Sequence, residues 1–426
     1  MDSKIKFIDG GVTAAKGFSA NGILCHIKAS RKTNDVALVY SEKICNAAGV
    51  FTQNRVKAES VKLSKKNIQN GKIQAIIANS GNANCCTGAQ GAENALKMAK
   101  AVSRVTGCDE NNVIVCSTGV IGSQLPVEKI ENNIQILKDG LSKEGHKEAR
   151  IAIMTTDTQY KECAVEFYIG QKLCHMGTMC KGSGMIHINL GTMLSFITTD
   201  CAISSAMLEK ALRESIKTTY NCVSVDGDTS TNDTLVILAN GMAENDEIKS
   251  EGEDFDIFLQ ALNKMNKVMA MKIAADGEGA TRLVQCTVNG AKTEENARGL
   301  AKQVISSSLV KAAMFGKDAN FGRFLCAMGY SGIDFDPEKV SIWFTSKKSA
   351  NRYFEDYDNF CVHGDESVQV YKDGVPLDFD EEKAKEIMSE EAVEILIQCG
   401  DGSASGVAWG CDLTYDYVKI NGDYRT

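Results

Sequence analysis

The sequence predicts an α+β protein, because strand-like and helix-like runs alternate through both halves of the chain. Residues 35–42 (DVALVYSE) and 72–81 (KIQAIIANSG) are apolar, rich in β-branched residues and followed by turn residues, as buried strands are. Residues 91–107 (GAENALKMAKAVSRVTG) carry apolar residues at helical spacing and end at a glycine, which predicts an amphipathic helix. Strands and helices that are mixed in this way favour a layered architecture.

The remaining elements follow in chain order. Residues 111–122 read as a strand that runs into a glycine-rich turn. The second half predicts a strand, a helix, two strands joined by a polar loop and a long helix, over residues 192–204, 205–221, 221–241 and 252–279. From about residue 283 we expect a smaller α/β subdomain with acidic loops, and we interpret the polar tail, residues 416–426, as strand-like.

Length and charge restrict the class of protein. The chain has 426 residues, enough for two or three domain-sized units, and a net charge of -8 without a basic block. Nucleic acid and anionic membranes are therefore not the expected partners. The N-terminus lacks the apolar segment of a secretory signal, and the apolar runs are too short to span a bilayer, so we expect a cytoplasmic protein.

The 16 cysteines suggest disulfides or a metal site, but their spacing argues against both. There is no C-x-x-C motif, and the five histidines are scattered. Most cysteines lie in apolar segments. We therefore expect reduced cysteines in the core, and no bound metal.

Polar loops carry the remaining chemical signal. No complete phosphate-binding loop, dinucleotide fingerprint or serine-hydrolase elbow is present. Each polar loop alone could be an ordinary turn, but together they suggest a polar site on a rigid scaffold. These loops cover residues 79–88, 117–122, 154–161, 181–185, 225–234, 275–282 and 316–325.

Residues 181–196 (KGSGMIHINLGTMLSF) pose a particular question. The segment begins as a glycine-rich turn and ends as a strand, with Thr192 at the transition, directly after Gly191. Thr192 is either the end of an ordinary loop or the residue before which the chain is cut. A cut would make Thr192 an N-terminal nucleophile, with its own α-amine, of pKa about 7.7–8.0, as the base.

Several motifs taken in order resemble the glutamate N-acetyltransferase (ornithine acetyltransferase) family of arginine biosynthesis, over essentially the whole chain. They are KGSGMI…GTML, STGVIG, SVDGDTSTNDT, ADGEGATR, GKDANFGR and AWGCDLTYDYVKINGDYRT. The resemblance implies a layered α-β-β-α sandwich like that of this family and the related D-aminopeptidases.

The resemblance also implies self-cleavage at the Gly191–Thr192 bond. Fragments of residues 1–191 and 192–426 would result, with lengths of 191 and 235 residues (426 minus 191). Thr192 would then carry the acetyl group, and Thr118 and Gly119 would match the family's oxyanion loop. The implied amino-acid-binding residues are Thr155, Lys181, Thr192, Glu278, Asn421 and Thr426. In this assignment Lys181 would bind a carboxylate and Glu278 an ammonium group.

The implied reaction is acetyl transfer from N2-acetylornithine to glutamate by a ping-pong mechanism, without a cofactor. Some family members also use acetyl-CoA as a donor substrate, and the sequence leaves open whether this chain does. The family's assembly, an α2β2 heterotetramer of the two fragments, is the expected partner arrangement.

This chain departs from the family pattern beside the cut. It has His187 and Ile188 where the family usually has Ala-Pro, and Gly191 where the family usually has Ala. The extra backbone freedom of glycine could slow cleavage. Two alternatives stay open: an amidase or aminopeptidase that uses water as the acceptor, and an uncleaved binding protein that has lost catalysis.

Overall fold

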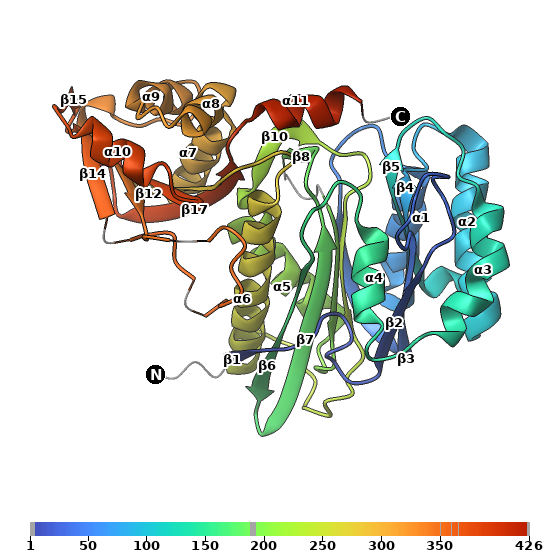
Figure 1. Cartoon of the computed structure of the whole chain (residues 1–426). Helices are drawn as coiled ribbons and strands as arrows, with labels where there is room; N and C mark the ends of the chain where they lie inside the picture. Colours follow the sequence, from blue (N-terminus) through green and yellow to red (C-terminus); the bar gives the residue numbers. More distant parts are fainter. Residues whose placement is uncertain (1–4, 188–192, 350, 359, 365, 424–426) are drawn as a thin grey trace. The chain divides into compact units, whose positions relative to one another are not determined.

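The structure is a computed structural model that describes residues 5–187, 193–349, 351–358, 360–364 and 366–423 (Figure 1). The chain forms two compact units, each assembled from separated segments. The larger unit comprises Met1–Gly182, Asn189–Lys217 and Thr229–Met269, and the smaller unit comprises Ser183–Ile188, Thr218–Asp228 and Ala270–Thr426. Both units combine helices with sheets, which confirms the predicted α+β class.

The larger unit is built on one mixed sheet. Its strand order is β1-β6-β7-β9-β11-β3-β4-β5, and β2 pairs with β3. Strands β4 and β5 are parallel, as are β9 and β11, whereas the other pairs are antiparallel. The strands are β1 (Ile5–Ile8), β2 (Phe18–Ile23), β3 (Val36–Phe51), β4 (Lys72–Asn82), β5 (Val113–Val120), β6 (Lys161–Ile169), β7 (Lys172–Lys181), β9 (Leu194–Thr199) and β11 (Thr234–Ala239).

Within the described ranges, six α-helices accompany this sheet in the sequence. They are α1 (Glu59–Asn67), α2 (Gly88–Thr106), α3 (Val127–Asp139), α4 (His146–Ile153), α5 (Ser205–Thr218) and α6 (Glu253–Ala275), with short 3-10 turns η1 (Ile68–Asn70) and η2 (Glu110–Asn112). The expected helix at residues 91–107 and the long helix before residue 276 are therefore confirmed.

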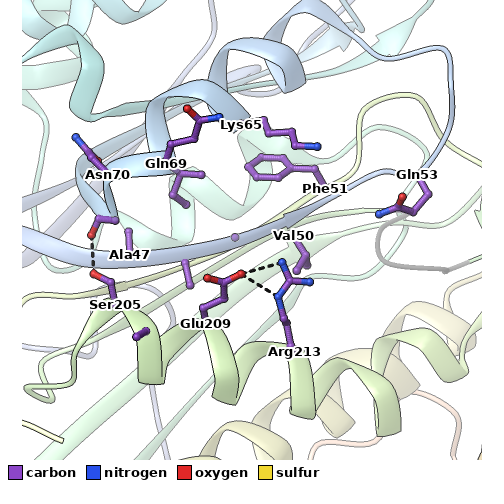
Figure 2. Close-up of a pocket in the computed structure, with 15 residues that line it drawn as sticks. Ala47, Val50, Phe51, Gln53, Lys65, Gln69, Asn70, Ser205, Glu209 and Arg213 are labelled. Atoms are coloured by element: carbon purple, nitrogen blue, oxygen red, sulfur yellow. Dashed lines mark hydrogen bonds and ion pairs between the residues drawn. The ribbon is translucent and has the colours of Figure 1, made fainter. Parts of the chain in front are cut away.

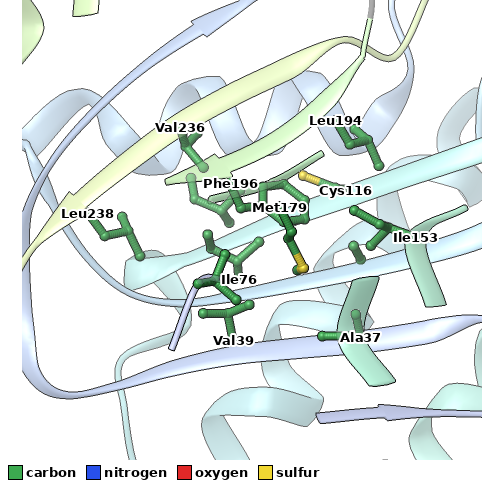
Figure 3. Packing of buried hydrophobic residues seen from close by; sticks show 14 of the residues in the cluster. Ala37, Val39, Ile76, Cys116, Ile153, Met179, Leu194, Phe196, Val236 and Leu238 are labelled. Carbon is green, nitrogen blue, oxygen red and sulfur yellow. The ribbon is translucent and has the colours of Figure 1, made fainter. Parts of the chain in front are cut away.

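Successive side chains of β3, β4 and β5 point to opposite faces of the sheet, so these strands contribute to two separate hydrophobic cores. On one face of these strands, residues such as Val36 and Leu38 pack against apolar residues of α2 and α3. On the other face, Ala37 and Val39 join a cluster that includes Phe196 of β9 (Figure 3). Two layers of strands therefore face each other across this second core.

Helices α5 and α6 belong to the next layer. Phe258 of α6 packs edge-on against Phe167 of β6, with ring centroids 6.1 Å apart. Asn266 of α6 donates a hydrogen bond of 2.9 Å to the hydroxyl of Ser215 on α5. The larger unit thus has the α-β-β-α order that the resemblance implied.

The smaller unit contains a six-stranded sheet of order β15-β14-β13-β16-β12-β17 and a two-stranded sheet of β10 and β8. Its strands are β8 (Ile186–His187), β10 (Ser224–Thr229), β12 (Leu283–Ala291), β13 (Ser341–Ser346), β14 (Glu366–Lys372), β15 (Val375–Pro376), β16 (Ala392–Gln398) and β17 (Ala404–Cys411). Its helices are α7 (Glu294–Ser306), α8 (Ser308–Gly316), α9 (Phe321–Gly329), α10 (Glu381–Ile387) and α11 (Tyr415–Gly422), with η3 (Tyr220–Cys222) and η4 (Pro337–Lys339).

The two units divide the chain differently from the predicted fragments. Each unit contains segments from both sides of the Gly191–Thr192 bond. Residue 283, the expected start of the C-terminal subdomain, lies inside the smaller unit, whose last segment begins at Ala270. The predicted fragments therefore describe processing, and their boundary stays a prediction.

Two details of the sequence interpretation are wrong. The tail is helical over Tyr415–Gly422, because the Thr414 hydroxyl accepts a hydrogen bond from the Tyr417 N–H and Lys419 lies in the last turn. All 16 cysteines are free, as expected, but three are exposed rather than in the core: Cys86, Cys326 and Cys361. In the part of the chain that the structure describes, no helix is long and apolar enough to cross a membrane.

Candidate active site

The predicted oxyanion segment lies at the end of β5. Gly119 pairs with Gly81 of β4 at an irregular position of the ladder and has a φ of +133°. A Cβ atom on Gly119 would lie 2.4 Å from the carbonyl carbon of Gly81 and 2.6 Å from the Asn82 nitrogen. Both the dihedral angle and the close backbone approach therefore require glycine at this position. Thr118, its neighbour, is half-buried.

Asn232 joins this segment to two other polar loops of the larger unit. Its side-chain amide donates hydrogen bonds of 2.6 Å to the Ala83 carbonyl and 2.7 Å to the Ser117 carbonyl. The residue is buried, so both bonds are protected from water. Three of the polar loops noted in the sequence thus converge, as a site built from loops requires.

Asp157 organises a second group of predicted residues in the larger unit. Its carboxylate accepts the Thr155 N–H at 3.1 Å, and its Oδ2 lies 3.7 Å from the Lys181 ammonium. It also accepts the Gly182 N–H at 2.7 Å and the Lys161 ammonium at 2.8 Å. Two predicted substrate residues, Thr155 and Lys181, are therefore held by one carboxylate that the sequence interpretation missed.

The charge of Asp157 is stabilised by its partners. Burial by itself would raise the pKa of this carboxyl group. The ammonium groups of Lys161 and Lys181 and the Gly182 N–H outweigh burial and hold the pKa of Asp157 well below its usual range. The sequence contained one signal that Asp157 supports the predicted site: it stands two residues after Thr155 and four before Lys161.

Glu278 and Asn421 lie together in the smaller unit. The Asn421 side-chain amide donates a 2.8 Å hydrogen bond to Oε2 of Glu278, whose backbone N–H donates to the Ser183 carbonyl at 2.9 Å. A Cβ atom on Gly184 would lie 2.2 Å from the Glu278 carboxyl carbon. The glycine of the KGSG turn therefore leaves the space that the Glu278 carboxylate occupies.

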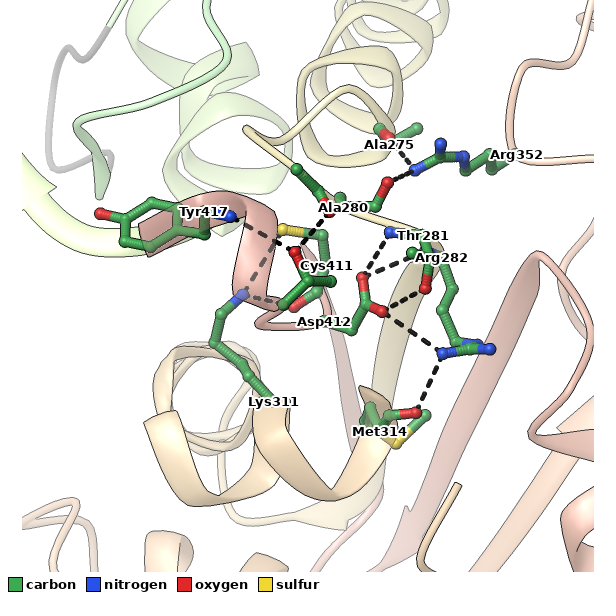
Figure 4. A network of polar contacts seen from close by, with 12 residues as sticks. Ala275, Ala280, Thr281, Arg282, Lys311, Met314, Arg352, Cys411, Asp412 and Tyr417 are labelled. Atoms are coloured by element: carbon green, nitrogen blue, oxygen red, sulfur yellow. Dashed lines mark hydrogen bonds and ion pairs between the residues drawn. The ribbon is translucent and has the colours of Figure 1, made fainter. Parts of the chain in front are cut away.

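The loop that carries Glu278 is anchored by the segment after β17. Asp412 accepts hydrogen bonds from the backbone N–H groups of Thr281 (2.8 Å) and Arg282 (3.1 Å), and its other oxygen contacts the Arg282 guanidinium at 3.3 Å (Figure 4). The Thr414 hydroxyl donates to the Gly279 carbonyl at 2.7 Å. The two motifs ADGEGATR and AWGCDLT thus form one rigid support in the smaller unit.

Three predicted site residues, Gly191, Thr192 and Thr426, lie outside the described residues. The residue after Thr192 is described: the Met193 carbonyl accepts a 2.9 Å hydrogen bond from the Thr234 N–H, and β9 begins at Leu194. The predicted cut therefore falls two residues before a buried strand.

His187, which replaces the usual alanine, has a local partner. Its Nδ1 lies 3.0 Å from the hydroxyl oxygen of Ser224. Burial, assisted by the charge of Lys302, lowers the pKa of His187 to about 4. The imidazole is therefore neutral near pH 7 and too weak a base to assist proton transfer efficiently.

A cavity of about 480 Å3 lies elsewhere in the larger unit, between α1 and α5 and over β3 (Figure 2). Its charged lining residues include Lys65 and the ion pair of Glu209 and Arg213, with nitrogen and oxygen 2.8 Å apart. None of the predicted site residues that the structure describes lines this cavity. Among the described residues, no cluster of three or more histidine, cysteine, aspartate or glutamate side chains could hold a metal ion.

The predicted site residues lie in polar loops on a layered α+β scaffold, and they include buried charged groups of both signs. These features are typical of an enzyme site rather than of a structural surface. The chain belongs to the ArgJ family, whose model matches residues 19–426. It is an acetyltransferase of arginine biosynthesis.

Curated relatives cover the chain from end to end. The arginine biosynthesis bifunctional protein ArgJ of Caldanaerobacter subterraneus is 48% identical over 99% of this chain and 100% of the relative. ArgJ 1 of Clostridium acetobutylicum is 46% identical over 100% of both chains. The crystal structure of ArgJ from Bacillus halodurans matches with 40% identity and a TM-score of 0.48, covering 55% of this chain and 100% of that chain.

Proposed function

We propose that the protein cleaves itself between Gly191 and Thr192 and then moves an acetyl group from N2-acetylornithine to glutamate through an acetyl-Thr192 intermediate. The observation that carries the substrate assignment is the pair of buried charges at predicted binding positions. Lys181 and Glu278 are each only 7% exposed. A buried ammonium group and a buried carboxylate are the partners that an amino acid's carboxylate and ammonium groups require.

The proposed mechanism uses the α-amine of Thr192 as the base. The amine takes the hydroxyl proton while the oxygen attacks the acetyl carbon of N2-acetylornithine. The amide bond then breaks, and the nitrogen of the leaving ornithine receives the proton from the amine. Glutamate attacks the resulting ester in the reverse sequence. Thr118 and Gly119 would stabilise the oxyanion in both halves of the reaction.

Self-cleavage would use the same hydroxyl group but not the amine as base, because that nitrogen belongs to the Gly191–Thr192 peptide bond until the cut. The Thr192 hydroxyl would attack the Gly191 carbonyl, the peptide C–N bond would break, and water would hydrolyse the ester. An α2β2 assembly of the two fragments in the cytoplasm completes the proposal. The ArgJ relatives are named as bifunctional proteins. Acetyl-CoA is therefore a second candidate donor.

The test is an acetyl-transfer assay with purified protein and N2-acetylornithine. Without glutamate we expect at most one ornithine per enzyme, because the acetyl group stays on Thr192; with glutamate, release should continue and produce N-acetylglutamate in equal amount. Continued ornithine release without glutamate would instead support the amidase alternative, with water as the acceptor. Replacing N2-acetylornithine by acetyl-CoA in the same assay decides whether this chain uses both donors.

Glu278→Gln is expected to raise the KM for N2-acetylornithine roughly tenfold or more, because a charge-assisted bond to the substrate ammonium group is worth about 1.5–3 kcal/mol. Self-cleavage should proceed normally. The exposed Glu294, which pairs with Arg298 on α7, offers a matched control, and Glu294→Gln should leave the KM unchanged. A Glu278→Gln protein with an unaltered KM would contradict the binding assignment.

A further inference from the structure

Cys85 and Cys86 are adjacent cysteines whose sulfur atoms lie side by side in the larger unit. Their two Sγ atoms are 3.8 Å apart, which is van der Waals contact. Cys86 is exposed, whereas Cys85 is fully buried. The pair stands in the polar loop of residues 79–88, and the proposed mechanism uses neither thiol.

Side-chain hydrogen bonds hold the loop around the two cysteines. The Asn84 amide donates to the Gly91 carbonyl at 2.8 Å, and the Thr87 hydroxyl donates to Oδ1 of Asn84 at 3.0 Å. Cys86 has a φ of +58°, in the left-handed region that residues other than glycine seldom occupy. Such a conformation persists only where the surrounding contacts enforce it. The contact between the two sulfurs is therefore a property of the folded loop.

The difference in exposure gives the two thiols different chemical roles. An exposed thiol can meet a soluble oxidant, and a cysteine beside it can then convert the product to a disulfide. Burial raises the pKa of the Cys85 thiol, so Cys85 stays protonated and does not react first. Cys86 is therefore the thiol that meets the oxidant. Cys85 needs no access to solvent in order to attack a sulfur 3.8 Å away.

A backbone hydrogen bond ties the pair to the predicted oxyanion segment, residues 117–122. The Cys85 carbonyl, which is part of the peptide unit between the two cysteines, accepts the Gly122 N–H at 3.0 Å. A disulfide needs its sulfurs about 2.05 Å apart, and adjacent Cα atoms, at about 3.8 Å, are closer than in most disulfides. The connecting peptide unit must therefore move when the bond forms. That movement disturbs the segment that contains Thr118 and Gly119.

We propose that Cys85 and Cys86 form a redox modification site, at which hydrogen peroxide converts the two thiols to a disulfide that displaces the oxyanion segment and lowers acetyl transfer. The strain of a disulfide between adjacent residues makes it easy to reduce, so the modification is reversible. The effect on acetyl transfer rests on the proposed function of the oxyanion segment.

The modification has two steps. The Cys86 thiolate attacks one peroxide oxygen, and the O–O bond breaks to give a sulfenic acid on Cys86 and a hydroxide ion, which takes up the proton that the thiol released. The Cys85 sulfur then attacks the Cys86 sulfur, the S–O bond breaks, and the departing hydroxide takes the Cys85 proton. The two thiols lose two electrons, and the peroxide is reduced to two molecules of water.

Peptide mapping of the purified protein after peroxide treatment tests the modification itself. At a peroxide concentration that oxidises free cysteine, the peptide that holds both cysteines should become lighter by two hydrogen atoms, and dithiothreitol should reverse the change. Two unmodified thiols would overturn the proposal. A sulfinic acid on Cys86 without a link to Cys85 would overturn it equally.

Hydrogen exchange tests the displacement of the oxyanion segment without any activity. The Gly122 amide should exchange severalfold faster in the disulfide form, because it loses its bond to the Cys85 carbonyl. An unchanged exchange rate would refute the displacement. A reduced wild-type protein that does not transfer acetyl groups would refute the proposed function, whereas mapping and exchange would still decide whether the disulfide forms and moves this segment.

Glutamate-dependent turnover tests the consequence. Oxidation should lower kcat roughly tenfold or more, because oxyanion donors act only when they are aimed at the developing charge, and reduction should restore it. Cys85→Ala keeps the exposed thiol but removes the resolving one, so peroxide should leave its kcat unchanged. Cys86→Ser should behave alike if Cys85→Ala fails to fold. Cys326→Ser, which removes an exposed cysteine of α9, should respond as wild type does. An equal loss of kcat in Cys85→Ala would contradict the disulfide as its cause.

Discussion

The purified protein is expected to separate under denaturing conditions into fragments of 191 and 235 residues (426 minus 191), the larger beginning Thr-Met-Leu-Ser. Thr192→Ala removes the hydroxyl that attacks the Gly191 carbonyl, so this variant should remain one full-length chain. It should also lose acetyl transfer, because both the nucleophile and the free α-amine are missing. Intact mass and N-terminal sequencing of wild type and variant measure both effects.

Thr192→Ser is the matched control, because serine retains a hydroxyl at the same position. It should still yield two fragments and measurable transfer. A wild-type protein that stays intact would contradict the proposal and favour the uncleaved binding protein. If the cut occurs but slowly, Gly191→Ala, which restores the residue usual in the family, should accelerate it by limiting the backbone freedom before the bond.

Asp157→Asn is expected to lower the free energy of unfolding by about 3–5 kcal/mol, because it leaves two buried ammonium groups without their carboxylate partner. The side chains of Lys161 and Asp157 are 0% exposed, and that of Lys181 is 9% exposed. Denaturant unfolding of both proteins gives the difference. The variant should also bind N2-acetylornithine more weakly, because Lys181 and Thr155 lose their common support.

The pH dependence of this difference follows from the lowered pKa of Asp157. A carboxyl group whose pKa is lowered by folding contributes stability that is fully present above its pKa in the unfolded chain, about 3.9, and is lost as the pH falls below that value. The difference in the free energy of unfolding between wild type and Asp157→Asn should therefore become smaller in acid. Asp139→Asn is the control, because Asp139 forms an exposed ion pair with Lys138 and should have little effect. Equal stability of Asp157→Asn and wild type at pH 7 would contradict the structural role of Asp157.

The sequence alone determined the α+β class and most of its elements. Strands such as β3 and β4 and helices such as α2 are specified by local periodicity and by turn residues, which are properties of neighbouring positions in the chain. The motifs around Thr118, Lys181 and Glu278 were equally visible, because they are contiguous segments that resemble the family's. The polar tail was misread as a strand because its eight-residue helix depends on a cap at Thr414 rather than on a periodic apolar face.

The surroundings of each charged side chain, in contrast, depend on the tertiary fold. Asp157 and Asp139 each have a lysine within four residues, and nothing in their local sequence separates a buried ion-pair centre from an exposed ion pair. The difference arises because the pairing of β6 with β7 brings Lys181 to Asp157 as well, and because the side chain of Asp157 is buried, whereas Asp139 and Lys138 stay exposed. The burial of Asp157 and its contact with Lys181 both depend on segments that lie farther away in the sequence, and both act on its pKa.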